Sequence, residues 1–256
     1  MDSMQKNLAC VIAYDGSKFY GSAKQAGFDS YPTVVGLFEN TLKTIGINTQ
    51  VISSSRTDKG VHATYQVLNF YARLYMPLER IQKLLNEKLF PYIRVKKIYE
   101  VAKDFHARFH AKARYYKYIF TRAALEPFYT HYIASLSYGC ESILKQALKE
   151  FEGEHDFSFF KKEGGSATNP IRRILKASLF KAKLAGQPCL VAHIGAPGFL
   201  RSQVRLMISA SIEASFNRIS LEAIRSQLRG HSALEPSPRL RKPAPACGLY
   251  LTKVIY

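Results

Sequence analysis

The stretch Ser55–Ala63 has the sequence SRTDKGVHA and forms a dense polar turn between two strand-like segments. Its single carboxylate, Asp58, lies among several hydrogen-bonding neighbours and next to Gly60. Catalytic side chains are commonly polar groups on loops that a rigid scaffold positions. An Asp beside Ser, Thr and Gly is more often a turn former or a helix cap. Local composition therefore makes Asp58 a candidate catalytic residue and leaves the turn-forming alternative open.

The segments around this turn predict an N-terminal half in the order β, α, β, α, β. Thr33 is the expected N-cap of a helix that ends at Gly46. The other predicted elements of this half are strands over Asn7–Tyr14, Tyr65–Ala72 and Ile93–Val101, and a helix over Leu78–Leu89.

The rest of the chain repeats this mixture of strands and helices. The sequence predicts strands over 114–120, 174–182, 189–194 and 248–256, and helices over 141–151, from Phe199 through Ile208, and over 221–228. Four prolines favour an extended surface loop over Ser232–Pro245. Because the two parts have similar element orders, we expect two α/β halves, over residues 1–103 and 104–256.

The charge of the chain favours a nucleic acid partner. The sequence has 37 Lys plus Arg against 19 Asp plus Glu, a net charge of +18, on a chain that is 47% hydrophobic. Such an excess on a folded protein indicates a polyanionic partner, and 16 Tyr and 16 Phe provide rings for base stacking. Solvated surface lysines without a partner are the alternative.

Cysteine usage and hydropathy favour a cytoplasmic protein without a membrane role. The four cysteines form no C-x-x-C pair, and the N-terminus has no apolar signal core. No apolar run approaches the roughly 20 residues that span a bilayer.

The segment Phe105–Tyr118 interleaves cations with aromatic residues, among them Arg114 and Tyr116. This pattern combines phosphate contacts with stacking surfaces and is typical of an RNA-facing strand. An ordinary amphipathic strand has a similar alternation, so the pattern alone leaves both interpretations open.

Other chemistries find little support in the sequence. His106 and His110 have the spacing of paired zinc ligands on a helix, but no Glu base or third ligand accompanies them. Residues 195–198, GAPG, lack a Walker lysine and the spacing of a dinucleotide fingerprint, and there is no G-x-S-x-G motif. We therefore expect no metal and no cofactor.

Arg201 and Arg205 are four residues apart and would share one face of the helix predicted from Phe199. An arginine that points inward could keep a buried carboxylate ionised, since its guanidinium does not readily lose its proton. Phosphate binding at the surface is the alternative for both residues.

At this point several separate motifs together resemble the TruA-type tRNA pseudouridine synthases of bacteria, in the same order and over nearly the whole chain. The matching motifs are Tyr14–Gly21 (YDGSKFYG), Arg56–Ala63 (RTDKGVHA), residues 105–118 (Phe105, Ala107, Arg108, Ala111, Ala113, Arg114, Tyr116, Tyr118), residues 153–160 (Gly153, His155, Asp156, Phe157, Phe160), Gly198–Leu200 with Val204 and Arg205, and Ala244–Ala246 with Gly248–Leu251.

This resemblance implies a function and a set of site residues. It implies that Asp58 is the catalytic nucleophile, that Tyr116 stacks on the target uracil, and that Arg205 pairs with Asp58. Arg56 would assist base displacement or bind phosphate, and Arg114 would bind substrate. The implied reaction converts uridine to pseudouridine at positions 38 to 40 of the tRNA anticodon stem-loop, without a cofactor or metal. A catalytically silent RNA-binding or tRNA-folding protein on the same scaffold is the alternative.

The resemblance also implies an architecture and an assembly. The fold would be α+β, the pseudouridine synthase fold, with two similar α/β halves forming a continuous, mainly antiparallel sheet flanked by helices. Members of the family are homodimers that bind tRNA in a basic cleft. This chain departs from the family at Ser22 and Ala23, where Trp-Gln is usual, at Val35, and at residues 201–203. These departures concern RNA contacts and target choice, whereas Asp58, Tyr116 and Arg205 are all present.

Overall fold

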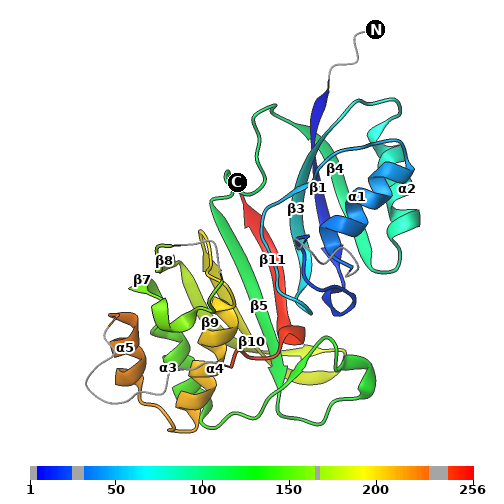
Figure 1. Cartoon of the computed structure of the whole chain (residues 1–256). Coiled ribbons are helices and arrows are strands. Elements are labelled where there is room, and N and C mark those ends of the chain that lie inside the picture. The colour runs from blue at the N-terminus through cyan, green and yellow to red at the C-terminus, as the bar shows by residue number, and fades with distance from the viewer. Residues whose placement is uncertain (1–4, 25–31, 165–167, 231–241) are drawn as a thin grey trace. The chain divides into compact units, whose positions relative to one another are not determined.

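The computed structural model describes residues 5–24, 32–164, 168–230 and 242–256 and has an α+β fold with mainly antiparallel strand pairing. Figure 1 shows the elements along the chain. The chain divides into two compact units. The first contains Met1–Lys112 together with Tyr250–Tyr256, and the second contains Ala113–Leu249.

The first unit is built on a sheet whose central strand, β1, is buried along most of its length. The strands lie in the order β4 (Ile93–Val101), β1 (Lys6–Tyr14), β3 (His62–Ala72) and β11 (Leu249–Ile255), with β2 (Ile52–Ser53) also paired with β3. Pairing is antiparallel except between β3 and β11, which run parallel. The last strand of the chain therefore returns to the unit that contains the first.

Two helices, α1 (Val34–Thr44) and α2 (Leu78–Leu89), cover one face of this sheet (Figure 1). Thr33 caps α1, since its hydroxyl accepts the Gly36 amide proton at 3.1 Å. Phe38 of α1 is fully buried and meets Phe70 of β3 with 6.2 Å between ring centroids. The apolar stripe of the helix thus anchors it to the sheet.

The segment after β4 is tied to the same sheet by two asparagines. The Asn7 side-chain amide donates to the Phe105 carbonyl at 2.8 Å, and the Asn69 carboxamide oxygen accepts the Ala107 amide proton at 2.9 Å. Both asparagines are almost fully buried and bonded to each other. These bonds satisfy backbone groups of an irregular segment that lies against the sheet.

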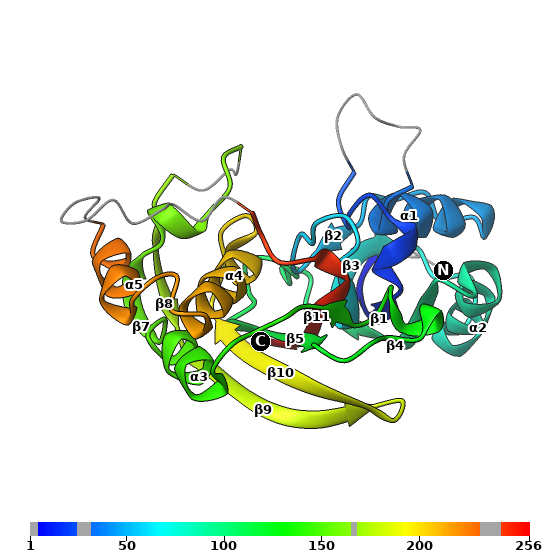
Figure 2. The same ribbon diagram turned by 90° about the horizontal axis from the view of Figure 1, so that it is seen from below.

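The second unit contains three long strands of the same nine-stranded sheet, with helices on one face (Figure 2). Its strands lie in the order β5 (Ala113–Thr121), β10 (Gln187–Ala196) and β9 (Lys176–Leu184), all antiparallel, and β6 (Ala134–Ser135) runs parallel to β5. Helices α3 (Glu141–Lys149) and α4 (Gln203–Ser215) pack together, and α3 contacts β9. The hairpin of β7 (Gly153–Asp156) and β8 (Ile171–Ile174) and the helix α5 (Leu221–Leu228) complete the unit.

Aromatic side chains fill the core of the second unit. Phe151, Phe157 and Phe160 are fully buried and contact one another through their rings. Tyr118 and Phe120 of β5 are also fully buried, with 5.9 Å between their ring centroids. Such rings contribute much of the apolar area that a domain of this size buries.

Most of the predicted elements are confirmed, with one clear error. The helix predicted from Phe199 begins only at Gln203, because Ser202 has a left-handed backbone (φ 56°) that no helix residue adopts. Most of the loop predicted over Ser232–Pro245 lies outside the described residues. The division predicted between residues 103 and 104 remains a prediction; by compactness, residues 104–112 and 250–256 group with the N-terminal half.

Candidate active site

The turn that contains Asp58 joins β2 to β3 in the first unit and is held by its buried residues. Thr57 is 8% exposed, whereas Asp58 is half-buried. The turn closes where the Val61 amide donates to the Asp58 carbonyl at 3.2 Å. Gly60 has a φ of 79°, a conformation that residues with a side chain rarely adopt. The turn therefore fixes the backbone of Asp58 and leaves its carboxylate partly accessible.

A second turn, at Gly21 and Ser22, braces the Asp58 turn. The Ser22 hydroxyl accepts the Thr57 amide proton at 2.8 Å, and the Ser22 amide donates to the Thr57 carbonyl at 3.1 Å. The Thr57 hydroxyl shares a 2.8 Å hydrogen bond with the Tyr14 hydroxyl. Buried hydrogen bonds thereby hold both the backbone and the side chain of Thr57. They fix the backbone from which the neighbouring Asp58 side chain extends.

His62 fixes the other end of the turn. Its Nδ1 accepts the Gly16 amide proton at 3.0 Å and lies 3.4 Å from an Asp15 carboxylate oxygen. Its ring stacks on Tyr250 of β11 with 4.7 Å between centroids. His62, in β3, thus contacts both the turn that follows β1 and strand β11, and it is 2% exposed.

The two cations of the turn lie at its surface. The Lys59 ammonium lies over the Tyr20 ring, 3.7 Å from its centroid. Arg56 is exposed, so solvent and solutes can reach its guanidinium. Arg56 is therefore available for an anion.

Tyr116 and Arg114 lie two positions apart on β5 in the second unit and so point to the same side of the strand. Tyr116 is 7% exposed and meets Phe199 edge to face, with 5.3 Å between centroids and 88° between ring planes. The Arg114 guanidinium donates to the Pro197 carbonyl. Residues 197–199 thus hold both side chains in place.

Arg205 lies in the first turn of α4 and is half-buried. Its Nε donates to the Ala244 carbonyl at 2.6 Å, and the Ala244 amide donates back to the Arg205 carbonyl at 3.1 Å. Burial raises the pKa of the Tyr118 phenol and that of the Cys247 thiol above their usual values, and the nearby Arg205 charge opposes this only in part. The Tyr118 hydroxyl donates to the carbonyl of Pro245, the residue after Ala244, at 2.9 Å, so adjacent residues bond Arg205 and Tyr118.

The prediction that Arg201 and Arg205 share a helix face is wrong. Arg201 precedes α4, and the Leu200 amide donates to the Gln203 side-chain carbonyl at 2.8 Å to begin the helix there. Arg201 is exposed, and its guanidinium donates to the Glu163 carbonyl at 2.9 Å. Of the two arginines, only Arg205 is held beside the buried rings of the second unit.

The structure thus distributes the predicted site residues over both units. Asp58 and Arg56 share one turn of the first unit, and Arg114, Tyr116 and Arg205 belong to the second. Ser22, which in the sequence stands only as a departure from the family motif, is a structural residue that bonds Thr57. No local pattern identifies it, because its bond to Thr57 spans 35 positions.

The described residues contain no group of three or more His, Cys, Asp or Glu side chains that could hold a metal ion. His106 and His110, the pair with zinc-like spacing, accept backbone protons through their Nδ1 atoms instead. In the same part of the chain, no helix is both long and apolar enough to cross a membrane.

Comparison with known proteins now connects these features. A family model described as tRNA pseudouridine synthase matches residues 10–110 and 147–256, ranges that include Asp58 and Arg205. The chain belongs to the tRNA pseudouridine synthase family. It is 44% identical over 249 residues to a tRNA pseudouridine synthase A of Helicobacter acinonychis, covering 96% of this chain and 98% of that protein. A Helicobacter pylori relative of the same name (strain ATCC 700392 / 26695) is also 44% identical over the same shares.

A more distant tRNA pseudouridine synthase A, from Helicobacter hepaticus, is 35% identical over 254 residues, covering 96% of this chain and 97% of that protein. The chain thus aligns with these relatives over nearly their whole length. Membership in this family makes the chain an isomerase whose reaction is the conversion of uridine in tRNA.

Proposed function

We propose that this enzyme isomerises uridine to pseudouridine at positions 38 to 40 of the tRNA anticodon stem-loop, with Asp58 as the nucleophile. The observation that carries the proposal is the Asp58 carboxylate on a turn braced by Ser22 and His62, in a chain of this family. The net charge of +18 supports a polyanionic substrate.

The reaction requires little from the protein besides one carboxylate and a fixed base. The bond from ribose C1′ to uracil N1 breaks, the base rotates, and C1′ bonds to C5. The C5 proton is released and N1 gains a proton, so there is no net redox change or hydrolysis. A base that leaves its stack needs a pocket and a ring to replace the lost stacking.

The second unit supplies groups for binding the base. We assign Tyr116 to stack on the target uracil. The edge-to-face contact with Phe199 holds the Tyr116 ring in one orientation, which supports this role. Arg56, exposed on the Asp58 turn, assists base displacement or binds a phosphate. Arg114 binds the substrate beside Tyr116.

Arg205 is assigned to pair with the Asp58 carboxylate. A fixed cation keeps a partly buried carboxylate ionised and aimed. Arginine suits this role because its planar guanidinium can bond a carboxylate while Nε remains bonded to the Ala244 carbonyl. We further propose that the enzyme is a cytoplasmic homodimer, as the family resemblance implies.

The test is conversion of unmodified tRNA by Asp58→Asn and Asp58→Ala enzymes, followed by mapping of pseudouridine. We expect both variants to lose a factor on the order of 10³ or more in rate, as removal of a nucleophile does. Their dissociation constants for tRNA should stay close to the wild-type value. The wild-type product should map to positions 38 to 40.

Asp104→Asn is the matched control, because Asp104 is an exposed carboxylate of the same unit. It should convert tRNA at the wild-type rate. Equal product from the wild type and both Asp58 variants would refute the catalytic assignment, and product at other positions would refute the proposed target.

A further inference from the structure

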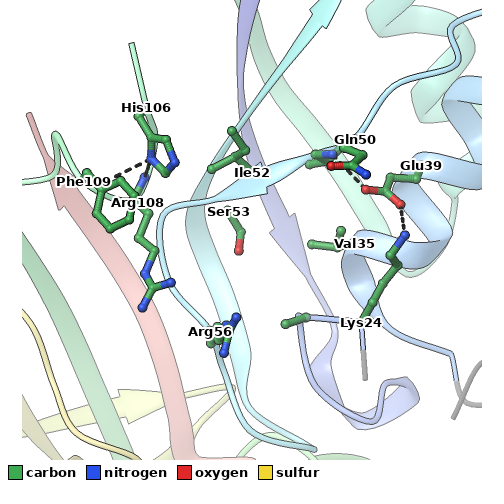
Figure 3. A pocket seen from close by; sticks show the side chains of 12 residues that line it. Lys24, Val35, Glu39, Gln50, Ile52, Ser53, Arg56, His106, Arg108 and Phe109 are labelled. Carbon is green, nitrogen blue, oxygen red and sulfur yellow. Dashed lines mark hydrogen bonds and ion pairs between the residues drawn. The ribbon is translucent and has the colours of Figure 1, made fainter. Parts of the chain in front are cut away.

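We infer that a pocket in the first unit, beside the Asp58 turn, is a second RNA subsite that binds one unpaired nucleotide of the tRNA other than the uridine that is isomerised. The inference rests on the proposed function. The pocket has a volume of about 380 Å³ and is lined by α1, β2 and the turn after β4 (Figure 3). This volume is within the range of small-molecule sites. Asp58 does not line it.

The charge of the pocket suits a phosphate. Its lining includes three cations, Lys24, Arg56 and Arg108, against one carboxylate, Glu39. Glu39 is already neutralised, because it pairs with Lys24 at 2.7 Å and accepts the Val51 amide proton at 2.8 Å. In Figure 3 Arg56 and Arg108 lie on the other side of the pocket from this pair. Because Glu39 is paired with Lys24, the two arginines give the pocket a net positive charge.

The turn that presents Arg108 and Phe109 is held by His106. The His106 Nδ1 accepts the amide protons of both residues, each at 3.2 Å. Its ring also lies against that of Phe109, with 4.3 Å between centroids and 30° between planes. The backbone of the turn is therefore ordered before any ligand binds, which lowers the entropic cost of binding.

Ala107 anchors the same turn to the sheet. It is fully buried; its amide donates to Asn69 Oδ1 at 2.9 Å and its carbonyl accepts the Tyr256 hydroxyl proton at 2.8 Å. Ala107 is thus bonded to β3 and to the C-terminal residue, and it holds the next two residues, Arg108 and Phe109, at the surface. Sites built on rigid supports hold their ligands with better geometry.

Phe109 contacts His106 and Arg108 but leaves most of its surface open. Its side chain is 72% exposed although it lies in a fixed turn. An exposed ring beside two arginines can stack on a base while the cations hold the adjoining phosphate. Val35 and Ile52 provide an apolar floor, and Gln50 and Ser53 can form hydrogen bonds with a base edge. An acidic peptide would use the cations but would not require the ring.

The first test measures tRNA affinity for Phe109→Leu and Arg108→Gln enzymes at several salt concentrations. Loss of one stacked base should weaken binding by about 5- to 150-fold, which corresponds to 1–3 kcal/mol. Loss of one phosphate contact should lower the slope of log K against log salt by about 0.7–0.9. Phe90→Leu and Arg80→Gln are matched controls, because both residues are exposed in the same unit and outside the pocket. Neither control should change affinity, and all four variants should melt at the wild-type temperature.

A second test pairs the protein variant with the RNA. Each unpaired anticodon-loop nucleotide is replaced in turn by an abasic one. At one position the missing base should weaken RNA binding by the wild-type enzyme but should not weaken binding by the Phe109→Leu enzyme any further. Wild-type affinity in both pocket variants, or additive losses at every position, would overturn the subsite. These outcomes are independent of Asp58: if Asp58→Asn still converts tRNA, the proposed catalytic assignment fails whatever the pocket variants do.

Discussion

The Asp58 turn and the Tyr116–Arg205 region hold polar side chains by different means. In the first unit Asp58 lies outside regular structure, and its turn depends on side chain to backbone bonds from Ser22 and His62. In the second unit Tyr116 lies within a strand and Arg205 within a helix, so the backbone ladders already fix both Cα positions.

This difference has a consequence for how each region tolerates change. Strand and helix backbones are stabilised by many cooperative hydrogen bonds, so a substitution there mainly affects one side chain. A turn held by a few buried bonds moves as a whole when one of them is lost. We therefore expect conservative changes at Arg205 to affect chemistry with little loss of stability, and conservative changes around Asp58 to affect both.

Arg205→Lys should have the largest effect in the second unit. Lysine keeps the charge but loses the Nε bond to the Ala244 carbonyl and the planar fork. A cation displaced by about 1 Å can cost about 10²-fold in rate. We expect a loss of this size in the single-turnover rate at saturating tRNA, with little change in tRNA affinity or melting temperature.

Arg201→Lys is the control for this variant, because Arg201 is exposed and precedes α4. It should keep the wild-type single-turnover rate. If Arg205→Lys instead weakens tRNA binding and leaves the rate at saturation intact, Arg205 is a phosphate ligand and the proposed pairing is wrong.

Gly16→Ala, in the first unit, should lower stability as well as activity, in contrast to Arg205→Lys. A Cβ at Gly16 would lie 2.0 Å from the Val61 carbonyl oxygen, a backbone atom that cannot move without the turn. Overpacking of this kind costs about 1–3 kcal/mol or more in the free energy of unfolding. We expect urea unfolding to show a free energy of unfolding lowered by about 3 kcal/mol, the upper end of this range, and we expect reduced tRNA conversion.

The matched variant is Gly198→Ala, because a Cβ there would meet nothing within 4 Å and the glycine has no left-handed φ. Its free energy of unfolding should stay within about 0.5 kcal/mol of the wild type. Equal stability of the two alanine variants would show that the Asp58 turn can shift without cost. It would contradict the expectation that changes around this turn lower stability.

The sequence predicted the elements whose signals are local. Helices α1 and α5 follow from their apolar spacing and their caps, and both Thr33 and Ser220 accept the expected amide protons. The start of α4 could not be predicted in this way, because the left-handed Ser202 interrupts a segment that is otherwise compatible with a helix. The parallel pairing of β11 with β3 is also invisible to periodicity, since their paired residues are 188 positions apart, as for His62 and Tyr250.

The candidate site shows the same division. The sequence predicts Asp58, Tyr116 and Arg205 as site residues because each lies in a local sequence motif. The residues that support them were not, because support depends on contacts between distant segments. Ser22 is the clearest case: read along the chain it is a departure from a family motif, whereas in the fold it is the acceptor for a buried amide of the Asp58 turn.

Ser22→Ala should have the smallest effect of the three. It leaves the buried Thr57 amide without its acceptor, which costs about 1–3 kcal/mol, whereas the backbone bond from Ser22 to the Thr57 carbonyl remains. Ser17→Ala is the matched control, since the buried Ser17 hydroxyl has no hydrogen-bond partner among the described residues and its removal should be neutral or slightly stabilising. Urea unfolding and single-turnover conversion should both separate the two variants. If they do not differ, the Ser22 hydroxyl contributes nothing to the stability of the Asp58 turn.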